Sequence, residues 1–143
     1  MAFIIVSGEV MQNSECVAAN VYVLSDQQGA YVGKHLLVDF YGAKNIDSVE
    51  RVSQALVAGV KAAGATLLHQ YFHYFTPNGG VSGVCVLAES HISIHSWPEF
   101  NYAAVDIFMC GDADPHRAVE VLKQSFSPSS VLVDEIRRGK NIT

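Results

Sequence analysis

The chain has 143 residues, enough for one domain with a substantial core, and half of them are apolar while 16% are charged. Its formal net charge of −5 argues against nucleic acid as a partner, because such a surface needs an excess of Lys and Arg. Its three cysteines, Cys16, Cys85 and Cys110, are odd in number and show no paired spacing. We therefore expect reduced thiols in a cytoplasm rather than a disulfide framework.

Residues 1–32 form an N-terminal extension of unknown role. The first 33 residues contain no Lys or Arg, and the apolar start Phe3–Val6 lacks the basic flank of a signal peptide and the length of a membrane span. Phe3–Val6 and Val17–Leu24 are candidate short strands, and Ser25–Gly29 has the composition of a turn or linker. The extension is compatible with an extra edge hairpin, a disordered lead or a contact with a partner subunit, and no membrane association is expected.

Residues 33–143 predict one domain that combines strands and helices. Strands are expected at His35–Tyr41, Thr66–Phe75, Val84–Ala88, Ile92–Ser96, Tyr102–Met109 and Val131–Ile136, followed by a polar tail at Arg137–Thr143. The first helix follows Asp47, which we expect to cap it with Glu50 as its partner, and ends at Gly64; the second begins at Asp114. Two such helices cover only one face of a sheet. We therefore expect an α+β fold, a two-layer α/β sandwich with a mostly antiparallel sheet and both helices on one face.

Chemically capable side chains stand at the ends of the strands expected between residues 82 and 111. They are Ser82, Glu89, Ser90, His95, Glu99 and Cys110. Because strands hold their ends rigidly, such side chains can converge on one site. The period of two also places His91, Ser93 and His95 on one face of their strand.

Three interpretations of this pattern are open. The first is the polar face of a half-buried strand that meets water. The second is a His-x-x-x-His metal site, but that motif pairs imidazoles on a helix, and no Cys or carboxylate follows at a zinc spacing, so no metal is expected. The third is nucleophile chemistry with a hydroxyl at Ser90, a base at His95 and a thiol at Cys110.

The order of the motifs favours the third interpretation. Glu89-Ser90-His91 is followed by His95-x-Trp97-Pro98-Glu99, Tyr102–Asp106 and Cys110-Gly111, and further motifs lie at Gly33–Tyr41, Gly64–Thr66, Phe72–Phe75 and Val81–Val84. This set closely resembles the prokaryotic S-adenosylmethionine decarboxylases, which are self-processing, pyruvoyl-dependent enzymes of polyamine (spermidine) synthesis. The resemblance covers about residues 33–138 and does not reach the N-terminal extension.

The chemistry of such an enzyme explains the residue types. Decarboxylation of an α-amino acid leaves a carbanion that needs an electron sink, and no lysine here stands in the setting that pyridoxal phosphate requires. A pyruvoyl group is a sink made from the chain itself: a serine attacks the preceding carbonyl, elimination from the ester cuts the chain, and hydrolysis leaves a ketone. This needs a serine in a well-held turn, a nearby base and donors for the oxyanion. Ser90, between two strands, meets the first requirement.

The resemblance implies a role for each candidate catalytic residue. Ser90 becomes the pyruvoyl group that forms a Schiff base with the substrate, after self-cleavage at Glu89-Ser90 into chains 1–89 and 90–143. Ser82 and His95 assist this processing, with His95 as the base in the elimination. Cys110 donates a proton to the product carbon, work that suits a thiol because its ordinary pKa of about 8.5 is close to neutrality.

The resemblance also implies the substrate contacts and the assembly. Glu99 corresponds to the carboxylate that binds the ribose hydroxyls of S-adenosylmethionine, and Phe75 and Trp97 correspond to adenine-site residues, although both also suit simple core packing. A symmetric homodimer with active sites at its interface is expected. Two departures from the family pattern stand out: the Pro77–Gly80 loop is one residue longer, and Met109 replaces a small polar residue.

Two other functions stay open at this point. One is a related pyruvoyl-dependent ornithine or arginine decarboxylase, which would lose the nucleoside contacts; the retained Trp97 and Glu99 argue against it. The other is an unprocessed, non-catalytic partner subunit, which should have lost Ser90, His95 or Cys110, and all three are present.

Overall fold

The computed structural model describes residues 5–6, 9–10 and 23–142. Its elements run in the order β1 (Ile5–Val6), β2 (Glu9–Val10), β3 (Leu24–Asp26), β4 (Gly29–Tyr31), β5 (Gly33–Tyr41), α1 (Val49–Ala63), β6 (Leu67–Tyr74), β7 (Val81–Leu87), β8 (His91–Trp97), the 3-10 helix η1 (Pro98–Phe100), β9 (Tyr102–Cys110), α2 (Pro115–Phe126) and β10 (Ser130–Arg138). Of the candidate strand Phe3–Val6, only Ile5–Val6 is described, as β1. The candidate strand Val17–Leu24 lies outside the described residues except at its last two positions.

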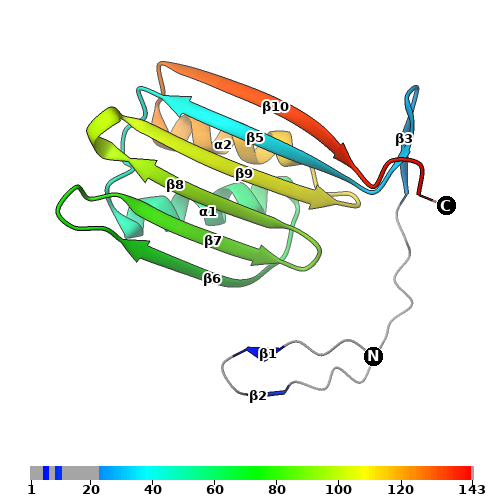
Figure 1. The fold of residues 1–143 in the computed structure, drawn as a ribbon, viewed down its shortest axis with the longest axis horizontal. Helices are drawn as coiled ribbons and strands as arrows, with labels where there is room; N and C mark the ends of the chain where they lie inside the picture. Colours follow the sequence, from blue (N-terminus) through cyan, green and yellow to red (C-terminus); the bar gives the residue numbers. More distant parts are fainter. Residues whose placement is uncertain (1–4, 7–8, 11–22, 143) are drawn as a thin grey trace.

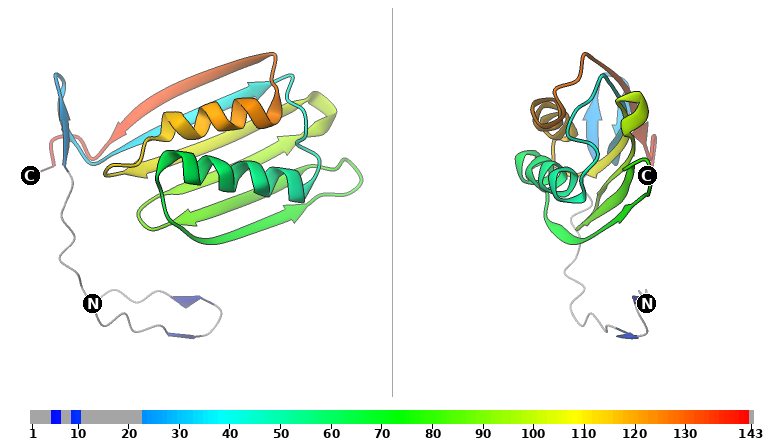
Figure 2. Two further views of the ribbon diagram at one scale, coloured as in Figure 1. Left: turned by 180° about the vertical axis from the view of Figure 1, so that it is seen from behind. Right: turned by 90° about the vertical axis from the view of Figure 1, so that its left-hand side faces the viewer.

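Six strands form one sheet in the order β10-β5-β9-β8-β7-β6 (Figure 1). Every neighbouring pair in this sheet is antiparallel. The helix α1 connects β5 to β6 and α2 connects β9 to β10, and both helices lie on the same face of the sheet (Figure 2). The predicted two-layer α+β sandwich is therefore confirmed.

The core lies between the two helices and the sheet face that they cover. Because side chains alternate along a strand, every second residue of the central strands is buried there, including Leu36, Val38 and Phe40 of β5, Ile92 and Ile94 of β8, and Val105, Ile107 and Met109 of β9. Leu56 and Val60 of α1 and Leu122 and Phe126 of α2 face them at helical spacing. No described helix covers the opposite face of the sheet, which we call the open face.

The helix ends follow from their capping residues. The hydroxyl of Ser48 accepts the Arg51 backbone N–H, so the prediction that Asp47 caps α1 was wrong by one position; Ser48 has the extended backbone that capping requires. At the other end, Gly64 has the left-handed φ of 76° that a C-cap glycine supplies. Asp114 caps α2 as predicted. Neither helix in this part of the chain is both long and apolar enough to cross a membrane.

The polar segment Ser25–Gly29, expected as a turn or linker, closes a hairpin between β3 and β4. Arg137 holds this hairpin: its guanidinium lies 2.6 Å from the Asp26 carboxylate and 5.2 Å from the centre of the Tyr31 ring. β10 therefore continues to Arg138, and the predicted polar tail begins later than expected. The division of the chain at residue 33 stays a prediction.

Candidate active site

The predicted site residues lie in two clusters, one toward each end of β8. Ser90 directly precedes β8, and His95 lies five residues further, a separation of roughly 16 Å along an extended strand. A single chain therefore does not bring them together. We call the two groups the Ser90 cluster, which consists of Glu89, Ser90 and Cys110, and the His95 cluster, which consists of Phe75, Ser82, His95, Trp97 and Glu99.

The Ser90 cluster is built on the tight turn from β7 to β8. The backbone N–H of Leu87 donates to the carbonyl of Ser90 at 2.9 Å, which closes the turn around Glu89. The hydroxyl oxygen of Ser90 accepts the backbone N–H of Cys110 at 3.4 Å, so the end of β9 lies directly beside it. All three residues of the cluster line a hollow of about 170 Å³. Ser90 is thus held in a fixed turn with an open space next to it.

The environment of Cys110 favours the protonated thiol. Burial raises the pKa of this thiol above its ordinary value, and the nearby Glu89 carboxylate raises it further. The neighbouring strand approaches closely at Gly33, where a Cβ atom would lie 2.8 Å from the Met109 carbonyl oxygen and 3.1 Å from the Cys110 sulfur. Only glycine lets β5 pass this near, a role that the sequence motif at Gly33 did not reveal.

The His95 cluster contains a direct hydrogen bond between two candidate processing residues. Ser82 and His95 face each other across the β7–β8 pair, and the Ser82 hydroxyl lies 2.8 Å from Nδ1 of His95. On the other side of Ser82, His73 of β6 is its direct cross-strand neighbour. A hollow of about 270 Å³ lies over this row and is lined by Tyr71, His73, Ser82, Gly83, Val84, Ser93 and His95.

Aromatic rings extend the His95 cluster along the end of the sheet. Trp97 stacks on Tyr102 with ring centres 5.4 Å apart, and Tyr102 stacks in turn on Tyr41. The Tyr102 hydroxyl donates to the Asp39 carboxylate at 2.5 Å, which together with burial raises the pKa of Tyr102 to about 12. Phe75 and Trp97 are both more than a third exposed, so neither is a core residue. Tyr102 covers one face of Trp97, and the centre of the His73 ring lies 4.6 Å from the Phe75 ring centre, so only the remaining exposed part of each ring can contact a ligand.

Glu99 lies in η1 and is contacted by the Pro77–Gly80 loop, which we expect to be one residue longer than in the family pattern. The side-chain amide of Asn78 donates to Oε1 of Glu99 at 3.4 Å, and the Asn78 carbonyl oxygen accepts the backbone N–H of Gly80. This contact occupies one oxygen of the Glu99 carboxylate and leaves the second for a ligand. The sequence predicted the extra length of the loop but not the residue that it would present.

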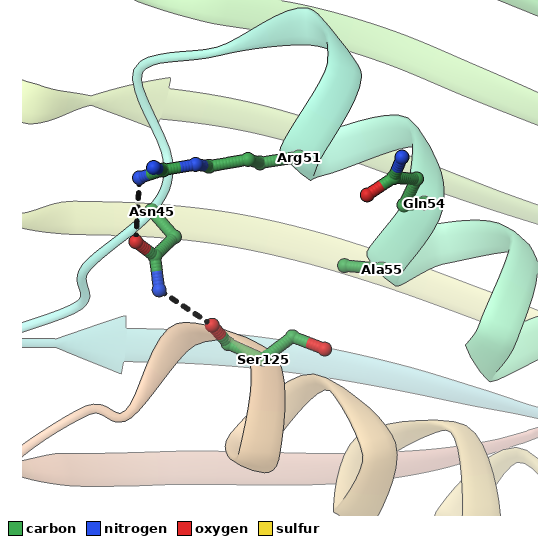
Figure 3. A pocket seen from close by; sticks show the side chains of 5 residues that line it. All are labelled: Asn45, Arg51, Gln54, Ala55 and Ser125. Atoms are coloured by element: carbon green, nitrogen blue, oxygen red, sulfur yellow. Dashed lines mark hydrogen bonds between the residues drawn. The ribbon is translucent and has the colours of Figure 1, made fainter.

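A further hollow lies away from both clusters. It has a volume of about 420 Å³, is lined by residues of α1, α2 and the segment before α1, and contains none of the candidate catalytic residues (Figure 3). Asn45 bridges it by accepting from Arg51 at 2.9 Å and donating to the Ser125 carbonyl at 3.1 Å. Within residues 23–142, no group of three His, Cys, Asp or Glu side chains is placed to hold a metal ion.

Comparison with known proteins agrees with this geometry. Residues 34–139 match the family model described as S-adenosylmethionine decarboxylase. The chain is 43% identical over 109 residues to the S-adenosylmethionine decarboxylase proenzyme of Thermomicrobium roseum, covering 76% of this chain and 94% of that protein. It is 45% identical over 112 residues to the proenzyme of Thermosipho africanus, covering 76% and 85%.

A solved structure extends the likeness to the fold. The crystal structure of the adenosylmethionine decarboxylase from Aquifex aeolicus superposes with a TM-score of 0.70 at 37% identity, covering 76% of this chain and 92% of that one. The family model takes in β5 to β10 with both helices, together with both clusters. From these matches and the residues that they span, the chain belongs to the S-adenosylmethionine decarboxylase family.

Proposed function

We propose that this chain is a proenzyme that cuts itself between Glu89 and Ser90 and then decarboxylates S-adenosylmethionine. The observation that carries the proposal is the Ser90 cluster: a serine held in a turn, with a thiol of raised pKa beside it and a hollow next to both. The relatives are named as proenzymes of this activity, and no feature of the open face favours ornithine or arginine instead.

The residues around Ser90 fit the formation of a pyruvoyl group. The bond from Leu87 to the Ser90 carbonyl fixes the turn, so the hydroxyl stays next to the carbonyl of Glu89 that it must attack. Such a group, once formed, supplies the electron sink for decarboxylation. Cys110 stands where it can return a proton to the product, and its raised pKa keeps that proton available near neutrality.

The substrate-binding residues belong to the other cluster. Trp97 and Phe75 offer exposed aromatic surface for a purine, and Glu99 offers a carboxylate oxygen for a ribose hydroxyl. These residues lie with Ser82 and His95, a strand's length from Ser90. A substrate that must touch both clusters therefore requires a second chain.

The open face has the character of an interface between two copies. Large apolar side chains are exposed on it across the sheet, namely Leu37, Tyr41, Tyr71, Val86, Trp97, Leu132 and Ile136. So many exposed large apolar side chains on one face of a sheet are typical of an interaction surface. On the same face, Nε2 of His35 is buried without a hydrogen-bond partner among the described residues, which a facing surface would supply.

A twofold arrangement would join the two clusters. If two open faces stack with the symmetry axis between the sheets and across the strands, the second copy is turned end for end. The Ser90 cluster of each copy then lies over the His95 cluster of the other, and two composite sites form. In this homodimer, Ser90 and Cys110 come from one protomer, and Ser82, His95 and the substrate-binding residues come from its partner.

Intact mass and activity test the proposed function. The purified protein should resolve into chains 1–89 and 90–143, with the second blocked at its N-terminus, and should release carbon dioxide from S-adenosylmethionine faster than from ornithine or arginine. Ser90→Ala should remain one chain, because it removes the nucleophile. A parent protein that stays uncut after long incubation would overturn the proposal.

A further inference from the structure

His95, Ser82 and His73 form a row across three neighbouring strands. Processing roles have been proposed for Ser82 and His95, but none for the His73 imidazole. The members of the row are direct neighbours in register: His95 faces Ser82 on the β8–β7 pair, and Ser82 faces His73 on the β7–β6 pair. All three line the same hollow on the open face. Cross-strand neighbours have Cβ atoms about 4.5–5.5 Å apart, so the His73 ring is within reach of the Ser82 hydroxyl.

The base role of His95 restricts where its proton is. To take a proton from the α-carbon of residue 90, one ring nitrogen must be free, and Nδ1 is already engaged with Ser82 at 2.8 Å. The free nitrogen is therefore Nε2, and Nδ1 carries the hydrogen and donates it to the Ser82 oxygen. The Ser82 hydroxyl must then donate its own hydrogen elsewhere. Among the described residues, its other cross-strand neighbour with an acceptor is His73.

We propose that His73 is a positioning residue of the processing site, whose ring accepts the Ser82 hydroxyl and so leaves Nε2 of His95 free to act as the base. This inference rests on the proposed function. In the step that it serves, His95 of one protomer takes the α-proton of residue 90 in the other. The electron pair forms the double bond to the β-carbon, the bond from that carbon to the ester oxygen breaks, and Glu89 leaves as a carboxylate.

The test follows the rate of chain cleavage after cell-free synthesis of the full chain. His73→Phe keeps an aromatic ring but removes the acceptor, and cleavage should slow about tenfold, the scale of one hydrogen bond. His73→Gln restores an acceptor and should recover most of the rate. His69→Phe is the matched control, because His69 lies on the same face of β6 but pairs with Val86 rather than Ser82; it should cut at the parental rate.

A spectroscopic readout separates positioning from folding. In the uncut Ser90→Ala chain, ¹⁵N shifts of the His95 ring should report hydrogen on Nδ1, and adding His73→Phe should move it to Nε2. The same tautomer in both chains, or parental cleavage in His73→Phe, would overturn the role of His73 while leaving the proposed function intact. If instead the parent chain itself is never cut, the proposed function fails.

Discussion

The environment of Cys110 supports its proposed role as the proton donor. Its thiol is partly buried at the end of β9, beside Glu89, and both surroundings raise its pKa. Cys110→Ala should therefore lower kcat by about 10²–10⁴-fold, the usual effect of losing a general acid. Cleavage at Ser90 should change much less, since the thiol is assigned to a later step. Steady-state kinetics and intact mass on the same preparation measure both effects.

The pH dependence of turnover gives this residue a second check. A proton donor with a raised pKa stays protonated at neutral pH and loses its proton only as the pH rises further. The alkaline limb of kcat should therefore lie above the ordinary thiol pKa of about 8.5. A limb below that value, or unchanged turnover in Cys110→Ala, would remove the thiol from the mechanism.

Glu99 is the residue that we propose distinguishes a nucleoside substrate from a plain amino acid. Its carboxylate can accept a ribose hydroxyl, whereas ornithine and arginine present no such group. Glu99→Gln should reduce kcat/KM for S-adenosylmethionine by about tenfold or more, because charge-assisted hydrogen bonds contribute roughly 1.5–3 kcal/mol. Asn78→Ala removes the 3.4 Å hydrogen bond to the Glu99 carboxylate and should reduce kcat/KM for S-adenosylmethionine by a smaller factor. Cleavage at Ser90 is the control and should be unaffected by either change. A parent protein that prefers arginine or ornithine would show that Glu99 serves another purpose.

At the scale of single elements, the fold could largely be predicted because its periodicity is strong. The buried residues of α1 recur at helical spacing, and those of β8 and β9 alternate. The type of each element and its buried face could therefore be predicted from the pattern. The β3–β4 hairpin could be named only as one of three possibilities for residues 1–32, because its strands are three residues long and its position depends on Arg137, more than a hundred residues away. The same contact explains why β10 extends into a segment that looked like a tail.

The contribution of the Arg137 contact to the stability of the β3–β4 hairpin can be tested by substitution. Arg137 lies 2.6 Å from both Asp26 and the side-chain oxygen of Gln28, and its side chain is 23% exposed. Arg137→Ala should lower the free energy of unfolding by about 1–2 kcal/mol and speed hydrogen exchange in Leu24–Tyr31. Arg117→Ala is the control, because the Arg117–Asp114 pair is exposed and 3.6 Å long, and such pairs contribute little. Equal losses of stability in Arg137→Ala and Arg117→Ala would contradict the role of Arg137 in holding the hairpin.

The sequence analysis did not predict that the site residues of one chain fall into two clusters, although their spacing implies it. His95 lies five positions after Ser90 along the strand, and that spacing alone sets a distance of roughly 16 Å. What the sequence does not contain is the second surface that, in the proposed homodimer, would bring the clusters together. The stacking of Tyr102 on Trp97 and the contact of Asn78 with Glu99 were also hidden, because each depends on where a loop returns to the sheet.

On the scale of the whole molecule, the proposed cleavage after Glu89 would divide the strands of the sheet between two chains. The first chain supplies β5, β6 and β7, and the second supplies β8, β9 and β10. Because β5 lies between β9 and β10, the strands of the two products are interleaved. The cut also falls in a loop rather than in a strand. We therefore expect the processed protomer to keep its fold and the open face to stay available for the proposed second copy.

The composite site predicts complementation between two inactive variants. Ser90→Ala lacks the nucleophile, and His95→Gln lacks the base, so each expressed alone should stay largely uncut. In a mixed dimer, one of the two sites combines the intact Ser90 of the His95→Gln chain with the intact His95 of the Ser90→Ala chain. Co-expression of differently tagged copies should therefore cut the His95→Gln chain only, which intact mass resolves. If both residues acted within one chain, neither variant would be cut in the mixture, and the twofold arrangement of the open faces would be wrong.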